Sequence, residues 1–167
     1  MSELTVGTIS GLAANNYVVD VAEGSQITQP GMVLQVVHAI SETTTTTTST
    51  SAVDTDLTAT ITPSSDSSKI AIFVSGTGTT SGTNSYGSRF RVYRGGSSGT
   101  ALNSLVTMFT GDNTSTADAP VSNVFLDSPS TTSPVTYTLC IYSSNVANTA
   151  YFGRAGQGSI MLMEIAQ

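Results

Sequence analysis

The sequence has few charged residues, and lysine is the rarest of them. Five basic and eleven acidic residues are spread over 167 positions, lysine occurs once as Lys69, and tryptophan is absent. Helical bundles carry Glu and Lys on their exposed faces, so this composition excludes them. The net charge of −6 and the pI near 4.3 leave no basic surface for a nucleic acid.

Cysteine and histidine each occur once, as Cys140 and His38. A single cysteine forms no intrachain disulfide, and zinc sites need several Cys or His ligands. Cys140 lies in the apolar run 138–142, which predicts a buried, inert thiol. His38 lies in the apolar run 34–40, which predicts a structural histidine; three copies on a trimer axis would be an alternative site for a metal or an anion.

Long apolar segments are also missing. The sequence contains neither a secretory signal with an apolar core nor a run of about 20 apolar residues. We therefore expect no membrane insertion, and no motif in the chain calls for a cofactor.

Hydroxyl side chains are what the sequence has in abundance, with 28 Thr and 25 Ser. The hydrophobic fraction of 38% and the mean hydropathy of +0.11 are too high for a disordered chain. Threonine is β-branched and favours strands. The composition therefore predicts an all-β domain.

Short apolar or alternating segments recur about every ten residues, and no helical period is sustained. This pattern predicts an antiparallel two-sheet β-sandwich of the jelly-roll type over residues 31–167. We expect a buried strand at 32–40, a hydroxyl-faced strand at 43–50, and loops at 76–87 and 111–120. The other expected strands are 57–62, 69–75, 88–94, 102–110, 121–126, 135–142, 150–152 and 159–165.

Residues 1–30 differ from the rest and are predicted to be an extended N-terminal segment for docking and trimerisation. Their apolar pieces are too short to be buried within one chain, and glycines interrupt them, so we expect them to pack against other copies or another protein. The predicted docking residues are Leu4, Val6, Ile9, Leu12, Val18 and Val19.

Catalytic constellations are sparse. Asp54 and Asp56 would share one strand face, and Asp112 lies in a Gly-Asp-Asn turn, but capping of turns is the more typical role of such residues. We expect no enzyme; a hydrolase acting through these three carboxylates is the least favoured interpretation.

Arg89, Arg91 and Arg94 lie within six positions and include Tyr93 between them. They are candidates for binding an acidic partner, with the tyrosine available to stack on a host-surface glycan. Pairing with scattered aspartates, within or between subunits, is the alternative that the sequence leaves open.

Five stretches taken in order resemble short structural proteins of tailed bacteriophages, especially marine phages. They are residues 4–11, 30–37, 61–70, 125–137 and 160–166. The resemblance implies a trimeric jelly roll on the exterior of a virion, with no catalytic residues and with residues 2–29 docking on other virion proteins. It does not separate a short tail fibre or spike from a capsid decoration protein, and a free carbohydrate-binding module is the alternative function.

Overall fold

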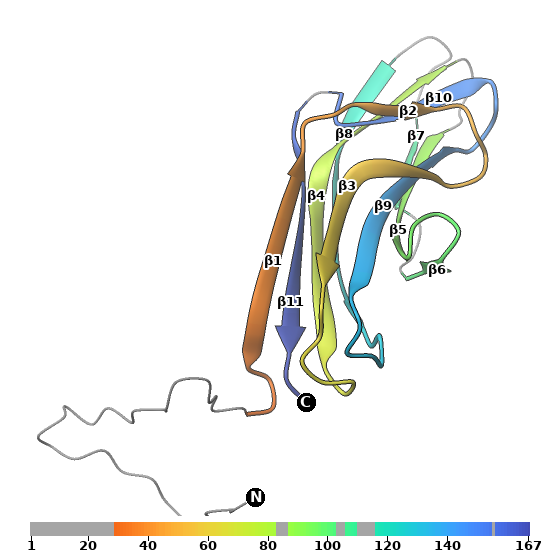
Figure 1. Ribbon diagram of the computed structural model, residues 1–167. Helices are drawn as coiled ribbons and strands as arrows, with labels where there is room; N and C mark the ends of the chain where they lie inside the picture. The colour runs from red at the N-terminus through yellow and green to blue at the C-terminus, as the bar shows by residue number, and fades with distance from the viewer. Residues whose placement is uncertain (1–28, 83–86, 103–105, 110–115, 155) are drawn as a thin grey trace, which may run out of the picture.

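The computed structural model describes residues 29–82, 87–102, 106–109, 116–154 and 156–167 (Figure 1). The predicted docking residues Leu4, Val6, Ile9, Leu12, Val18 and Val19 lie outside the described residues, as does Asp112. The boundary predicted between residues 30 and 31 stays a prediction.

The described residues form strands joined by turns. The strands are β1 (Val33–Ser41), β2 (Thr45–Thr47), β3 (Val53–Ile61), β4 (Lys69–Gly82), β5 (Gly87–Arg94), β6 (Thr100–Ala101), β7 (Val106–Phe109), β8 (Thr116–Asp127), β9 (Val135–Ser143), β10 (Asn148–Phe152) and β11 (Gly158–Ile165).

The strands make two antiparallel sheets that face each other (Figure 1). In sheet A, β4 pairs with β8 along one edge and with β11 and β10 along the other; β1 then pairs with β11, and β2 with β10. In sheet B the order is β3, β9 and β5, and both β6 and β7 pair with the far edge of β5. Three positions in the sheets are thus each shared by two strands: β1 with β2, β10 with β11, and β6 with β7. With each of these pairs counted as one strand, the strand order is that of a jelly roll. The predicted fold class is confirmed.

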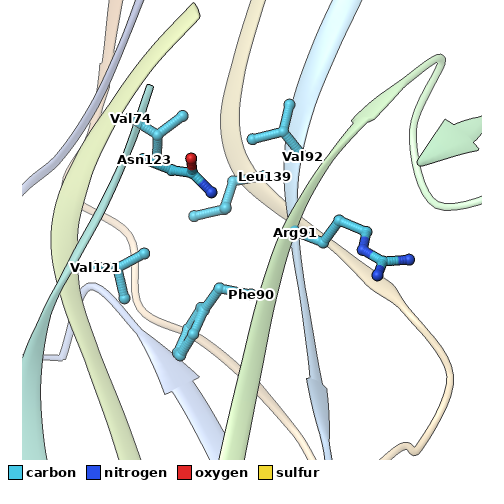
Figure 2. Close-up of a pocket in the computed structure, with 7 residues that line it drawn as sticks. All are labelled: Val74, Phe90, Arg91, Val92, Val121, Asn123 and Leu139. Carbon is cyan, nitrogen blue, oxygen red and sulfur yellow. The ribbon is translucent and has the colours of Figure 1, made fainter. Parts of the chain in front are cut away.

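The core lies between the sheets and consists of alternate residues from both. Figure 2 shows Phe90, Val92 and Leu139 of sheet B pointing toward Val74 and Val121 of sheet A. The gap that they line has no volume for a water molecule. The described core residues are therefore close-packed at this position.

Strand β4 is longer than predicted, because residues 76–82 continue it where the sequence suggested a loop. The glycines there have a packing role. A Cβ atom on Gly76 or on Gly158 would lie 2.5 Å from the ring of Phe152. The two glycines make room for this aromatic ring in the core, so they belong to strands.

Three further expectations were wrong in part. Strand β1 is not buried, because Val36 and Ile40 are each 53% exposed. The threonine-rich segment 43–50 is paired only at residues 45–47, and the loop expected at 111–120 gives way to β8 from Thr116 onward.

Glu164 is a fully buried carboxylate at an inward position of β11. Gln35 of β1 donates a hydrogen bond to it at 2.6 Å, and the backbone N–H and the hydroxyl of Ser64 each donate one at 2.7 Å. Burial alone would raise the pKa of Glu164, but these hydrogen bonds outweigh it and lower the pKa to about 2. The carboxylate thus joins β1, β11 and the turn between β3 and β4.

We expect Glu164→Gln to lower the free energy of unfolding at pH 7 by on the order of 3 kcal/mol, because the amide cannot accept the same set of hydrogen bonds. The folded-state pKa lies below the ordinary value of 4.5, so the stabilisation is present above pH 4.5 and is lost as the pH falls toward 2. Denaturant unfolding over this range should show the gap between variant and wild type closing.

The exposed Glu42 provides a matched control for this measurement. Glu42→Gln should change stability by no more than about 0.5 kcal/mol. Equal effects of the two substitutions, or a Glu164→Gln effect that is independent of pH, would contradict the assignment.

Candidate functional site

The outward face of sheet B carries hydroxyl groups over β3 and β9. Thr58 and Thr138 lie opposite each other with their hydroxyl oxygens 3.1 Å apart, and Thr60 and Thr136 repeat the pair at 2.7 Å. Such cross-strand pairs stabilise a sheet modestly and keep its surface hydrated. Here the hydroxyl-rich composition forms a polar outer surface.

Arg89, Arg91 and Tyr93 also point outward, from β5. Figure 2 shows Arg91 directed away from the core. The strand register places Arg89 opposite Tyr142 and Arg91 opposite Cys140 of β9. Neither arginine forms an ion pair with a described residue, and their Nε atoms are buried without a hydrogen-bond partner. The structure thus brings together three of the four predicted surface-binding residues.

Arg94 is the exception, because it lies on the inward side at the end of β5. Its Nη1 atom is 3.1 Å from Oδ2 of Asp127 on β8, in the opposite sheet. The hydroxyl of Tyr137 donates to the same oxygen at 2.8 Å, and burial, with this bond, raises the pKa of the tyrosine. Arg94 therefore connects the two sheets and is not part of the arginine surface. The pairing with an aspartate, which the sequence left open, applies to this residue.

Asp54 and Cys140 lie beside the arginines under the turn that follows β5. The carboxylate of Asp54 accepts a hydrogen bond from the backbone of Ser97 at 2.6 Å and lies 3.2 Å from the sulfur of Cys140. Burial, reinforced by Asp54, raises the pKa of the Cys140 thiol. The expectation of a buried thiol is confirmed, its inertness stays a prediction, and Asp54 caps a turn.

Part of the outward face of sheet A is apolar, where β1, β11, β4 and β8 pair, and sequence analysis missed this feature. The part of the same face around Thr46, Thr79 and Asp118 is polar. Three successive rows of outward residues cross the sheet, each running through paired residues of β1, β11, β4 and β8. They are Val36, Met163, Ala71 and Leu126; His38, Met161, Phe73 and Val124; and Ile40, Ser159, Ser75 and Ser122. We call these twelve residues the apolar face. The signal that could have revealed it is the unbroken apolar sequence of 70–74 and 160–163, which has no alternation.

Several residues of the apolar face are strongly exposed. Val124 and Leu126 are each 62% exposed. A depression of about 260 Å³ lies beside them, lined among others by His38, Phe73 and Met161. His38 is exposed and has no hydrogen bond to a described residue, so the expectation of a satisfied structural histidine was wrong. These exposed apolar side chains make the apolar face a candidate interaction surface.

Metal and membrane features were sought in the part of the chain that the structure describes. Its His, Cys, Asp and Glu residues form no group of three that could hold a metal ion. None of its elements is a helix long and apolar enough to cross a membrane.

Comparison with known proteins gave one structural neighbour of note. No protein-family model matches the chain, and no curated protein matches it either. A chain in the solved structure of infectious bursal disease virus, Gt strain, is similar with a TM-score of 0.31 and 12% sequence identity. The match covers 90% of this chain and 41% of that one, so this protein spans less than half of the viral chain's length.

The different roles of the arginines lead to a test by substitution. Arg94→Met should lower the free energy of unfolding by on the order of 2 kcal/mol, because it leaves the carboxylate of Asp127 largely buried without its cation. Arg89→Met should change stability by less than about 1 kcal/mol, because no ion pair is lost. Chemical denaturation of both variants checks this, and a larger loss for Arg89→Met would contradict the assignment.

Proposed function

We propose that the chain is a non-enzymatic structural protein of a bacteriophage virion: a homotrimeric β-sandwich that projects from the particle and docks through its N-terminal segment. Its place would be that of a short tail fibre or spike, or of a capsid decoration or head-fibre protein. The observation that carries this proposal is the contrast between the two outer surfaces of the jelly roll. One is hydroxyl-rich and suited to solvent, whereas the other is apolar and suited to packing.

The sequence supports the viral part of the proposal. The five stretches that resemble phage structural proteins include parts of β1, β3, β4, β8, β9 and β11, which belong to both sheets. The buried core and the capped carboxylates are typical of a structural protein. Among the reactive side chains that the structure describes, Cys140 is buried and Asp54 binds a turn, whereas His38 is exposed.

A second candidate function is carbohydrate binding, either by a free module or by the projecting domain on the virion. The observation in its favour is the pair Arg89 and Arg91, which point outward beside Tyr93 and form no ion pair with a described residue. Guanidinium groups bind carboxylates or sulfates, and a tyrosine ring can stack on a sugar. An anionic polysaccharide of a host surface fits this chemistry.

Locating the protein on native particles tests the structural role. Immunogold labelling and quantitative mass spectrometry should find it on the exterior of purified virions. Hundreds of copies would indicate capsid decoration, and a few to tens would indicate the tail. Absence from purified particles would refute the virion role.

The carbohydrate function has its own test. Binding of the wild-type protein to immobilised anionic polysaccharides should fall about tenfold or more when both Arg89 and Arg91 are replaced by methionine. Asp56→Asn is the control on the same side of the sheet and should not weaken binding, because it removes a negative charge that repels an anionic polysaccharide. No binding by the wild type, or equal binding by the double variant, would contradict the second candidate.

A further inference from the structure

We infer that the apolar face of sheet A is the surface through which copies of this chain associate, so its occupant is the same face of further copies. This inference rests on the proposed function and adds the location of the interface. The N-terminal segment and a different virion protein are the competing occupants, and the experiment separates them from a second copy.

The first argument is the sequence pattern of the strands beneath the face. Strands that are solvated on one side alternate apolar and polar residues, whereas strands buried on both sides have continuous apolar runs. Residues 70–74 and 160–163 are continuous apolar runs. In a single copy, the described residues cover these strands on their inner side only. Association through the apolar face covers the other side and accounts for the pattern.

The second argument is area. The face extends over four strand positions about 4.8 Å apart and along about six residue steps of about 3.3 Å, which gives roughly 400 Å² in projection. Two such faces cover on the order of 800 Å² before side-chain relief is counted, which approaches the roughly 1,200 Å² of a small specific interface. The face alone therefore has the area of a weak interface, or of one part of a larger interface.

The third argument is charge. The chain carries a net charge of −6, so its copies repel one another on average. His38 is the only titratable residue among the twelve of the apolar face, and none of them is acidic. Two copies therefore meet with the least repulsion through this face. The outward side of sheet B, by comparison, carries Arg89, Arg91 and Asp54 in the same area.

The fourth argument is shape. A surface that packs against its own copy must carry both protrusions and hollows. Val124 and Leu126 protrude from β8, and the depression of about 260 Å³ lies next to them, where three serines replace larger side chains. The same face thus provides both halves of a self-complementary contact.

The full-length protein carrying Val124→Lys tests the inference, with Val146→Lys as the matched control. Val146 is 70% exposed and lies in the turn between β9 and β10, outside the apolar face. Analytical ultracentrifugation should show the wild type and Val146→Lys as oligomers. Val124→Lys should sediment as a single chain, with association weakened by about 100-fold or more, because a lysine would be buried without a partner. Circular dichroism and thermal unfolding check that the fold is kept, and Leu126→Lys serves as a second variant if Val124→Lys does not fold.

The outcomes separate the possible occupants. A wild type that sediments as a monomer overturns the inference; protection of Met161 from peroxide in that monomer would show that the N-terminal segment covers the face instead. Oligomers that survive both lysine substitutions also overturn it. A wild-type dimer that Val124→Lys dissociates supports the interface and refutes the trimer of the proposed function, so the two failures are distinguishable.

Discussion

The structure depends on one geometric constraint: a strand in a two-layer sandwich can give only every second residue to the core. The inner residues of both sheets, including Phe90, Leu139 and Ile72, fill the interior without room for water. A single copy needs nothing further from the outer residues than solubility. The side chains at those outer positions therefore indicate whether each face contacts solvent or another molecule. Sheet B carries hydroxyl groups and two arginines there, and sheet A carries aliphatic and thioether side chains.

Two carboxylates lie close together at one end of the sandwich. The register places Glu164 and Asp127 on either side of Ile70, in one row across sheet A. Each carboxylate is satisfied in a different way, Glu164 by neutral donors and Asp127 by an arginine and a tyrosine. The hydrogen bonds and the ion pair of these two carboxylates connect β1, β5, β8, β9 and β11 with the turn after β3. This end of the jelly roll is fixed by directional bonds, whereas its middle is held by packing.

The sequence predicted the fold class because strands such as β3 and β5 alternate apolar and polar residues and are flanked by typical turn residues. Prediction was weaker where both faces of a strand are apolar. Residues 32–40 were interpreted as a buried strand, yet Val36 and Ile40 are exposed, because hydrophobicity reports a preference for burial and not the identity of the partner that provides it. The extension of β4 was missed for a different reason. Gly76 has the signature of a loop, and its role in accommodating the ring of Phe152 depends on a residue far away in the sequence.

In the candidate site, too, the sequence pattern predicted some features and missed those that depend on the three-dimensional arrangement. Spacing alone grouped three arginines, but the two-residue period separates Arg94 from Arg89 and Arg91, and the sheet then directs them to opposite sides. No sequence signal pointed to Glu164 as a buried acid, because its donors come from positions 35 and 64.

The structure shows which faces of the two sheets carry the abundant hydroxyl groups. On sheet B the threonines pair across strands, so they contribute to stability as well as to hydration. On the apolar face only one row contains serines, and these small residues help to form the depression. Hydroxyl groups therefore do not coat the whole domain. In an assembly that covers the apolar face, sheet B with Arg89 and Arg91 remains the surface that faces outward. The same strand alternation that builds the core thus separates a packing surface from a contact surface, and substitutions on one should leave the other intact.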